Sequence, residues 1–326
     1  MGVSIQLQKF GAPEDVVSVV ELQDLTPDQG EVVIDLEAAN INPSDCLTVR
    51  GMYGVLPKKF PASLGNEGVG KVSKIGKGVS DKLLGQRVSL PMGGGVWSSQ
   101  LICPADKLLP LPNELPAEQL AMALINPPTA YLLLTSVLDV PKGGWVIQNA
   151  ANSNVGQAVN VFAKDLGINI INLVRSDSAA LTLEGYDHVF HSTDPQLHEK
   201  VKLLVGENKA ILGLDAIGGD ATMQLADLLS RRGTIASYGA LSGHACKLAP
   251  HHTIFKGIKL QGFWLVNWFN TATPQDFMAM NARVGGKIAD GSLNIPVEAT
   301  YPLEDAVTAL QHAERPRRTG KILFKG

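Results

Sequence analysis

The clearest alternation of apolar and polar positions lies between residues 145 and 175. An apolar run covers residues 145–148, and a turn of small residues follows it. After the turn, apolar side chains recur at the spacing of a helix that buries one face, at Val155, Ala158, Val159, Phe162, Ala163 and Leu166. Gly167 predicts the end of this helix, and the β-branched run at residues 168–174 predicts a strand buried on both faces. Strand, turn, helix and strand make a βαβ unit, one half of a doubly wound sheet.

The turn of this unit is the candidate binding site for a pyrophosphate. A helix N-terminus offers backbone N–H groups and positive dipole, and small residues let a ligand approach. The usual fingerprint is G-x-G-x-x-G, whose positions hold Ala151, Ser153 and Gly156 here. Gly156 allows close helix packing, and the side chains of Asn152 and Ser153 offer hydrogen bonds to phosphate. A βαβ unit that binds no nucleotide remains the alternative, because the motif alone is weak.

The residue at the end of the second strand indicates which dinucleotide is bound. An Asp or Glu there would hold a ribose 2′-OH, but the position holds Arg175. A guanidinium suits a 2′-phosphate, so the sequence favours NADPH over NADH. A solvated arginine is the alternative, and Asp177, two residues further on, weakens the preference.

Short β-rich runs dominate the part of the chain before residue 117. Runs at residues 16–22, 31–36, 69–75 and 87–90 are separated by glycine turns, which is typical of a small barrel with sharp corners. Prolines between residues 110 and 116 mark a boundary, and residues 117–138 then read as helical.

Strand and helix patterns alternate in the rest of the chain. Apolar runs at residues 187–190, 211–216 and 233–238, with a helix at 220–231, predict a parallel sheet covered on both faces. A strand at 259–265 and a helix at 274–290 follow. The last strand, at residues 321–324, lies outside the βαβ block and is expected to complete the first lobe. We therefore expect a β-rich domain of residues 1–117 and 266–326 and a nucleotide domain of residues 118–265.

Composition describes a well-packed globular chain. The 326 residues are 45% hydrophobic and 18% charged, with a net charge of −3. Nucleic acid is excluded as an expected partner, because no block of basic residues appears. We expect no membrane span, since the apolar stretches are short and interrupted by prolines. The first residues also lack a leader pattern, so the expected location is cytoplasmic.

Cysteine spacing gives no framework for disulfides or structural zinc. Cys46 and Cys103 lie far from each other and from Cys246, and no CxxC pair occurs. One cluster of ligand-type side chains keeps a metal site open as an alternative to an ordinary loop, although its spacing matches no established zinc pattern: His244, Cys246, His251 and His252.

Six motifs, in order along nearly the whole chain, resemble the medium-chain dehydrogenase/reductases and, within them, the 2-enoyl thioester reductases. The resemblance implies an α/β fold, with a GroES-like β-rich catalytic domain and a Rossmann doubly wound parallel sheet as cofactor domain. The motifs occupy residues 42–45 (NPSD), 51–53 (GMY), 65–69 (GNEGV), 126–131 (NPPTAY), 148–153 (QNAANS) and 262–265 (GFWL).

The resemblance also implies that no metal takes part. Zinc alcohol dehydrogenases of the larger family would carry a cysteine at the position of Asn42 and a histidine at that of Asn66. An amide does not replace a thiolate on zinc. Zinc-free members reduce activated double bonds or quinones.

Site residues are carried over by position. Tyr53 is similar to the family's catalytic tyrosine. Two departures, Asp177 where a second arginine is common and a short helix before Gly185, put affinity at the adenine end in doubt. The positions that resemble those lining NADPH are Asn126, Thr129, Asn152, Ser153, Asn154, Val155, Gly156, Arg175, Ser176, Tyr238, Gly239, Leu241, Phe263, Trp264, Leu265 and Lys321.

The implied activity is NADPH-dependent reduction of the double bond of trans-2-enoyl thioesters in fatty-acid metabolism. Hydride transfer to the β-carbon makes an enolate, whose charge needs a hydrogen-bond donor. A tyrosine, with a free pKa of about 10, stays protonated at neutral pH and can donate to the thioester oxygen. The alternative for Tyr53 is that it only packs in the cleft wall.

Two rival functions and two partner expectations remain. One rival is a zinc-free NADPH:quinone oxidoreductase of the same superfamily. The other is a non-catalytic protein that keeps the fold for nucleotide binding. We expect a small enoyl thioester as substrate, with coenzyme A or acyl carrier protein as its carrier, and a homodimer formed through the Rossmann domain.

Overall fold

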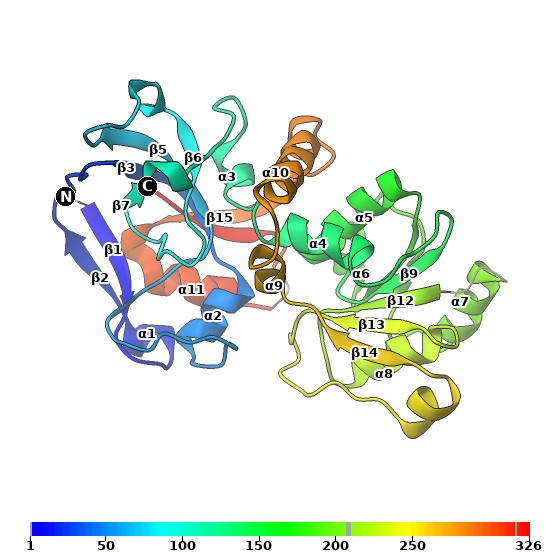
Figure 1. The fold of residues 1–326 in the computed structure, drawn as a ribbon. Coiled ribbons are helices and arrows are strands. Elements are labelled where there is room, and N and C mark those ends of the chain that lie inside the picture. Colours follow the sequence, from blue (N-terminus) through cyan, green and yellow to red (C-terminus); the bar gives the residue numbers. More distant parts are fainter. Residues whose placement is uncertain (1, 207–209, 317) are drawn as a thin grey trace. The chain divides into compact units, whose positions relative to one another are not determined.

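The computed structural model describes residues 2–206, 210–316 and 318–326. The chain forms two compact units, one of residues 1–124 with 285–326 and one of residues 125–284. Both chain ends lie in the first unit, which is rich in strands (Figure 1). The second unit alternates strands and helices.

The second unit is built on a parallel sheet of order β11-β10-β9-β12-β13-β14. Neighbouring strands are parallel throughout this order. The order reverses at β9, whose neighbours are β10 and β12. Such a reversal opens a crevice at the carboxyl ends of the strands, where ligands bind in open α/β sheets. The strands are β9 (Trp145–Gln148), β10 (Asn169–Val174), β11 (Val189–His191), β12 (Ala210–Asp215), β13 (Thr234–Ser237) and β14 (Lys259–Gly262).

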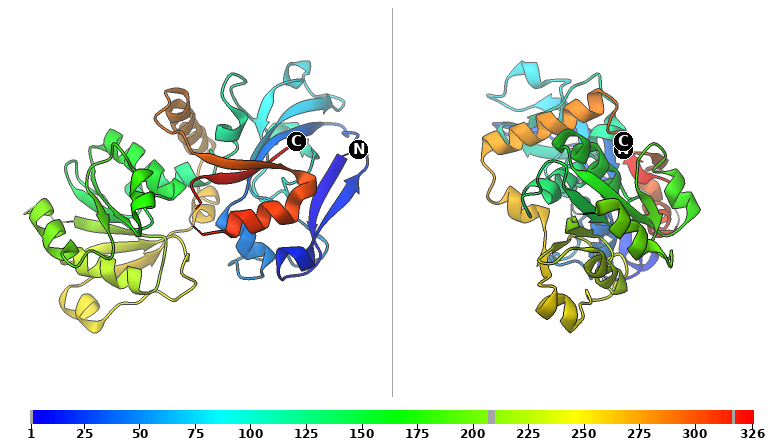
Figure 2. Two further views of the ribbon diagram at one scale, coloured as in Figure 1. Left: turned by 180° about the vertical axis from the view of Figure 1, so that it is seen from behind. Right: turned by 90° about the vertical axis from the view of Figure 1, so that its right-hand side faces the viewer.

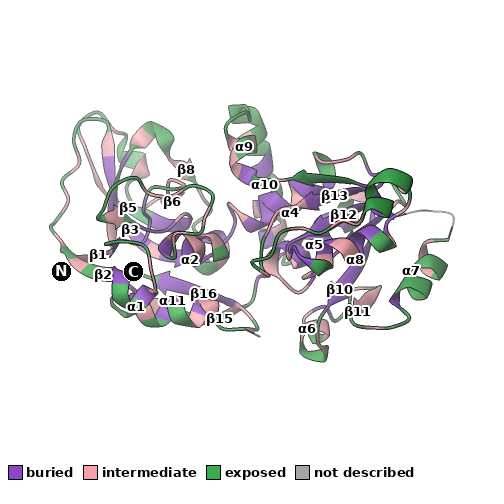
Figure 3. Ribbon diagram, turned by 90° about the horizontal axis from the view of Figure 1, so that it is seen from below, coloured by how far each residue is buried: buried purple, intermediate pink, exposed green. Residues whose placement is uncertain are grey.

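Helices cover both faces of this sheet. On one face, α7 and α8 bury Leu197, Val201 and Leu225 against Ile147. On the other, α5 packs against α4 and β10, and Figure 1 shows α5 and α8 on opposite sides of the strands. Figure 3 shows β10 buried along its length and much of α7 exposed. The helices that begin in this unit are α4 (Asn126–Thr135), α5 (Asn154–Leu166), α6 (Asp177–Leu181), α7 (Leu197–Val205), α8 (Asp220–Leu228), α9 (Leu265–Phe269) and α10 (Pro274–Ala289), and α10 ends in the first unit.

The first unit contains two sheets, of order β2-β1-β4 and β15-β16-β3-β5-β6-β8, with β7 also paired to β3. The C-terminal strand β16 pairs antiparallel with β3, so the end of the chain shares a sheet with the first lobe. The elements are β1 (Gly2–Leu7), α1 (Pro13–Val16), β2 (Val17–Leu22), β3 (Glu31–Asn40), α2 (Pro43–Val49), β4 (Ala62–Ser63), β5 (Gly68–Ile75), β6 (Arg87–Ser89), β7 (Gln100–Pro104), β8 (Leu109–Pro110), α3 (Ala117–Leu120), β15 (Val297–Pro302), α11 (Ala306–Glu314) and β16 (Lys321–Lys325).

The core of the first unit forms around Trp97. Its ring meets Phe324 of β16 edge to face at 5.1 Å, and its Nε1 donates to the backbone oxygen of Asn40 at 3.2 Å. The C-terminal helix α11 packs against β16 and α2 (Figure 2). Residues from both ends of the sequence therefore share one core.

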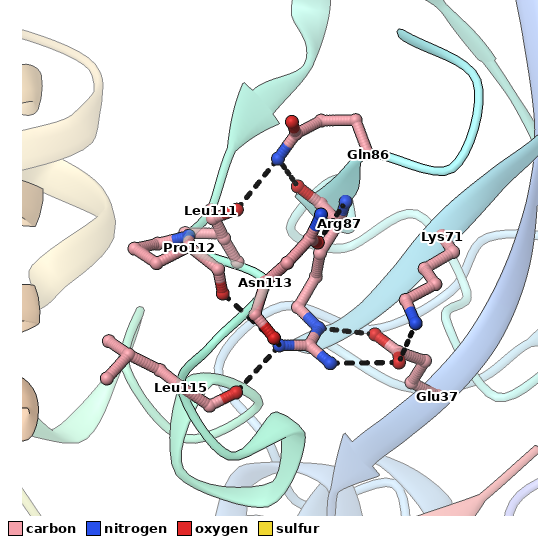
Figure 4. Close-up of polar contacts among 8 residues, drawn as sticks. All are labelled: Glu37, Lys71, Gln86, Arg87, Leu111, Pro112, Asn113 and Leu115. Carbon is pink, nitrogen blue, oxygen red and sulfur yellow. Dashed lines mark hydrogen bonds and ion pairs between the residues drawn. The ribbon is translucent and has the colours of Figure 1, made fainter.

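Arg87 fastens the segment that leaves the β-rich lobe. Its Nε and Nη2 donate to the Glu37 carboxylate at 2.5 and 3.0 Å (Figure 4). Its Nη1 donates to the backbone oxygens of Pro112, Asn113 and Leu115 at 3.2, 2.9 and 2.7 Å. One buried guanidinium thus joins β3, β6 and the proline-rich segment.

We expect Arg87→Met to lower the free energy of unfolding by about 3 kcal/mol, because it leaves the Glu37 carboxylate and three carbonyls without their donor. Urea denaturation followed by circular dichroism measures this change. The matched control is Lys71→Met, since Lys71 reaches Glu37 only at 3.4 Å from a half-exposed position. Its loss should cost less than about 1 kcal/mol, and an equal cost for both variants would contradict the role given to Arg87.

The structure differs from the sequence-based prediction in two elements and in the domain boundaries. The continuous helix expected at residues 117–138 is two helices, α3 and α4, because Pro127 and Pro128 fit only the first turn of a helix. The strand expected at 259–265 ends at Gly262, and Leu265 begins α9. The units change over at residues 124/125 and 284/285. The expected boundaries were 117/118 and 265/266; α3 packs on β3 and β5, which places it with the first unit.

Candidate active site

The turn between β9 and α5 has the shape that the sequence predicts. Ser153 caps α5, accepting a hydrogen bond from the Gly156 backbone N–H at 3.1 Å. A Cβ at Gly156 would lie 2.4 Å from the backbone oxygen of Ala151, so only glycine fits there. The backbone of the turn therefore lies tightly against the start of the helix. The first N–H groups of α5, other than that of Gly156, face the end of the helix where an anion binds.

A buried amide cluster supports this turn from below. Gln148 and Asn160 both donate to the backbone oxygen of Gly156, at 2.9 and 3.2 Å. Both also donate to Asn172 Oδ1, at 2.7 and 2.9 Å. The cluster ties β9, β10 and α5 together. Sequence analysis missed it, although polar residues inside two apolar strands were a signal.

The loop after β13 lies beside the loop after β12. The backbone N–H groups of Tyr238 and Leu241 donate to the oxygens of Asp215 and Ala216, each at 3.0 Å. A Cβ at Gly239 would lie 2.7 Å from the oxygen of Ala216. Asp215 itself, fully buried, accepts from Asn149 at 2.7 Å and from Thr222 at 2.5 Å. The carboxyl ends of β9, β12 and β13 are thus joined by hydrogen bonds.

Two buried polar groups at this edge suit a phosphate ligand. Asn154 Nδ2 is buried and has no hydrogen-bond partner among the residues that the structure describes. The Tyr238 hydroxyl is also buried, and it has no partner within hydrogen-bonding geometry among those residues. Burial raises the pKa of the Tyr238 phenol, which Ser153 partly offsets. A buried donor without a partner costs free energy, and a phosphate group of a dinucleotide would accept the hydrogen bonds of these two donors.

Arg175 lies exposed at the end of β10 and forms no ion pair within the described ranges. Ser176 caps α6 by accepting from the backbone N–H of Ala179 at 3.3 Å. Asp177 Oδ1 lies 3.2 Å from His191 Nε2, so the acid expected to weaken the cofactor preference has a neighbour on β11. The helix α6 spans five residues, which confirms that this segment is short.

Other predicted cofactor residues of the second unit lie on two segments. Asn126 and Thr129 are buried in the first turn of α4. Phe263 follows β14, and its backbone N–H donates to the Ser237 oxygen at 2.8 Å. Trp264 is 40% exposed, whereas Leu265 is buried at the start of α9.

In the first unit, Tyr53 lies on the loop that follows α2. Gly51 has a φ of +73°, in the left-handed region that favours glycine, and the Met52 N–H donates to the Leu47 oxygen at 2.8 Å. The Tyr53 side chain is half-buried. The loop is therefore anchored directly before the predicted catalytic residue.

The positions compared with zinc ligands form a hydrogen-bonded cluster. Asn40 and Asn42 each donate to Glu67 Oε1 at 2.7 Å. Lys321, which was expected to line the cofactor, belongs to this unit and donates to Asn42 Oδ1 at 2.6 Å. Asn66 donates to Asp45 Oδ1 at 2.5 Å. The side-chain amides at these positions are thus hydrogen-bonded to two carboxylates and one ammonium group.

Burial changes the proton affinities in this cluster. Removal from water raises the pKa of Asp45 to about 7 and lowers that of Lys321 to about 8. Each shift disfavours a charged form. The Lys321 ammonium and the Glu67 carboxylate offset part of each other's burial cost, since each stabilises the other's charge.

We expect exhaustive chelation to leave activity unchanged, because amides stand where the thiolate and imidazole ligands of a zinc site would be. The check is the rate before and after dialysis against EDTA and a stronger zinc chelator. Loss of activity that added zinc restores would contradict this expectation.

The His244 to His252 cluster separates into distinct groups. Cys246 Sγ lies 3.6 Å from Ser237 Oγ, and His244 is exposed. His252 is buried; its Nδ1 accepts from the Ala249 N–H at 3.1 Å and its Nε2 lies 2.7 Å from Asp227 Oδ1. Nε2 therefore carries the proton and donates to the carboxylate. Although ligand atoms of Asp227, His251 and His252 lie within 4.8 Å of one another, that tautomer leaves His252 no lone pair for a metal.

Two hollows, of about 340 and 360 Å³, contain none of the predicted site residues. The first lies beside β1 and β7, and the second between α7 and α8. Among the described helices, none is long and apolar enough to cross a membrane.

Comparison with known proteins gives matches over the whole chain. A family model described as "Alcohol dehydrogenase GroES-like domain" matches residues 28–113, and one described as "Zinc-binding dehydrogenase" matches residues 154–283. The "Enoyl-[acyl-carrier-protein] reductase, mitochondrial" of Xenopus tropicalis is 35% identical over 319 residues, covering 95% of this chain and 91% of that protein.

Solved structures agree. A putative NADPH:quinone reductase from Bacillus thuringiensis has a TM-score of 0.90 at 27% identity and covers 100% of this chain and 99% of its own. The quinone oxidoreductase of Escherichia coli, complexed with NADPH, has a TM-score of 0.86 at 28% identity and covers 99% of this chain and 100% of its own. These matches confirm the predicted fold class, a GroES-like domain with a Rossmann domain.

The expected cytoplasmic location is wrong by this comparison, because the relatives from Xenopus tropicalis and Homo sapiens are mitochondrial proteins. Composition and separated cysteines do not distinguish the cytoplasm from the inside of an organelle. The expectation therefore rested on features that both locations share.

Proposed function

Because the chain belongs to the medium-chain dehydrogenase/reductase superfamily, in the family of the enoyl-[acyl-carrier-protein] reductases, we propose that it reduces the carbon-carbon double bond of trans-2-enoyl thioesters with NADPH. The observation that carries the proposal is the match to an enoyl reductase along 95% of the chain. The activity is an oxidoreduction on a CH–CH bond and belongs to fatty-acid metabolism.

The dinucleotide would be held by the second unit. The N–H groups at the start of α5, the buried Asn154 amide and the Tyr238 hydroxyl suit its phosphates. Arg175, exposed at the end of β10, suits the 2′-phosphate that distinguishes NADPH. When bound, the nicotinamide would supply the hydride that reaches the β-carbon. The remaining carried-over residues keep their proposed contacts on the strength of the family resemblance.

Tyr53 is the proposed catalytic residue. Its hydroxyl donates a hydrogen bond to the thioester oxygen, which stabilises the negative charge that develops there. It also helps to supply a proton at the α-carbon, so no metal and no covalent nucleophile are needed. The anchored Gly51–Met52 backbone supports this role, because it fixes the start of the Tyr53 loop.

Quinone reduction is the second candidate. It is favoured by the TM-scores of 0.90 and 0.86 to a putative quinone reductase and to a quinone oxidoreductase. Enoyl reduction is preferred because the enoyl-[acyl-carrier-protein] reductase of Xenopus tropicalis is 35% identical along 95% of the chain. Parallel assays with enoyl thioesters and a quinone decide between them.

Acyl carrier protein is proposed as a carrier of the substrate.

A homodimer formed through the Rossmann domain is proposed as the assembly. Support for the dimer comes from β14, an edge strand whose four residues are all exposed. Beside it in the sequence, Ile254 and Phe255 are each 69% exposed. Sedimentation should give twice the chain mass for the native protein. Leu260→Lys, on β14, should shift it toward the monomer, and a native monomer would reject the proposal.

A further inference from the structure

We infer that an exposed apolar patch beside the Tyr53 loop, flanked by three lysines, is the docking surface for an acidic carrier protein that delivers the enoyl group. This inference rests on the proposed function, because it gives the carrier a place to bind. We define the carrier patch as Phe10, Met52, Val55 and Phe60 with Lys9, Lys58 and Lys59.

Contacts within the first unit join the two phenylalanines of the patch to each other and to the start of the Tyr53 loop. The rings of Phe10 and Phe60 meet edge to face, with centroids 4.9 Å apart. Phe10 also covers Gly51, where an added Cβ would lie 2.9 Å from the Phe10 side chain. The N–H of Gly11 donates to the Val49 oxygen at the end of α2, at 3.0 Å. Two segments distant in sequence thus meet directly beside the loop that carries Tyr53.

The apolar side chains of the patch are exposed to solvent. Met52 and Val55 are 63% and 58% exposed, and both phenylalanines are exposed as well. Single exposed apolar residues are ordinary, but large apolar side chains gathered around a functional loop mark interaction sites. The loop is anchored, with Met52 N–H bonded to Leu47, so the patch is presented on fixed backbone at its start.

The positive charge of the three lysines indicates an acidic partner. Lys9, Lys58 and Lys59 are exposed, and none forms an ion pair within the part of the chain that the structure describes. The chain as a whole has a net charge of −3, so this group is a local exception. The acid nearest to Lys9 in sequence, Glu14, accepts a hydrogen bond from Gln311 of α11, and its own backbone N–H together with that bond lowers its pKa. Uncompensated ammonium groups around an apolar centre attract and orient an acidic protein.

The test compares one enoyl group on three carriers. Crotonyl-acyl carrier protein, crotonyl-coenzyme A and crotonyl-pantetheine share the reacting bond, but only the first has a protein surface and only the third lacks phosphate. The variant is Lys58→Glu with Lys59→Glu. The matched control is Lys77→Glu, an exposed lysine on the turn after β5.

We expect the double variant to raise KM for the crotonyl-carrier protein about tenfold, with the other two substrates and the control within about twofold. Raising salt from about 50 to about 300 mM should raise the wild-type KM for the carrier substrate only. An equal rise for coenzyme A and carrier would mean phosphate recognition and would overturn the inference. An equal rise for all three substrates would mean damage to the Tyr53 loop, with the same consequence.

Binding of fluorescently labelled carrier protein, followed by anisotropy, separates this inference from the proposed function. If the enzyme turns over quinone but no thioester, yet binds the carrier and loses that binding in the double variant, the docking surface stands and the proposed function fails. If the double variant binds the carrier as tightly as the wild type, the docking surface is rejected whatever the activity.

Discussion

Replacing Tyr53 with phenylalanine is expected to lower the rate with enoyl thioesters about 10²–10³-fold, the usual effect of losing one donor to a developing oxyanion. The change removes a single oxygen and keeps the ring, so packing of the loop after α2 should be retained. Binding of NADPH, followed by nucleotide fluorescence, should stay within a few-fold. Steady-state kinetics with crotonyl-coenzyme A measure the loss.

The matched control for this variant is Tyr186→Phe, which removes the same oxygen from a half-buried tyrosine of the second unit. It should leave the rate unchanged. Quinone turnover should depend less on Tyr53, because the oxyanion formed on a quinone is better stabilised by its own ring. An unimpaired Tyr53→Phe enzyme with enoyl thioesters would remove Tyr53 from the mechanism.

Replacing Arg175 with alanine is expected to raise the dissociation constant of NADPH by one to two orders of magnitude. A lost charge-assisted contact to the 2′-phosphate is worth about 1.5–3 kcal/mol. NADH lacks that phosphate, so its binding should be nearly unchanged. Because Arg175 is exposed and has no ion pair within the described ranges, its loss should not disturb the fold.

Arg231→Ala is the control for this measurement, since Arg231 is also exposed in the second unit. It should leave the binding of both nucleotides unchanged. Titrations of NADPH and NADH against the wild type and the two variants give the six constants needed. Equal weakening of the two cofactors by Arg175→Ala would contradict the assignment of Arg175 to the 2′-phosphate.

Local patterns predicted the βαβ unit well. The apolar spacing from Val155 to Leu166 became α5, which ends where Gly167 adopts a φ of 68°. The β-branched run before Arg175 became β10, with its inner residues buried. Such elements are readable because one period of burial and one glycine cap decide them within a short stretch.

Elements that depend on tertiary contacts were harder to predict. Helix α7 was not foreseen, because only Leu197 and Val201 of its residues are buried and the apolar face is narrow. The amide cluster under the nucleotide turn joins Gln148, Asn160 and Asn172 across 24 positions of sequence. No local period signals a hydrogen-bond network of that kind.

The residues of the candidate site also differ in how far local sequence predicts them. The turn at residues 151–156 and Arg175 follow from their place after a strand, and the structure puts them at the carboxyl ends of β9 and β10. Lys321 could be named only through the family resemblance. Its contact with Asn42 joins residues 279 positions apart, and a single sequence without that resemblance offers no signal for such a pair.

The decisive measurement for enoyl thioester reduction is NADPH oxidation with the purified protein, using crotonyl-coenzyme A, a long-chain enoyl thioester and a quinone in parallel. We predict rapid NADPH-dependent reduction of the enoyl thioesters, with slower or no turnover of the quinone. Rapid turnover of the quinone with no reduction of either thioester would contradict the proposed function.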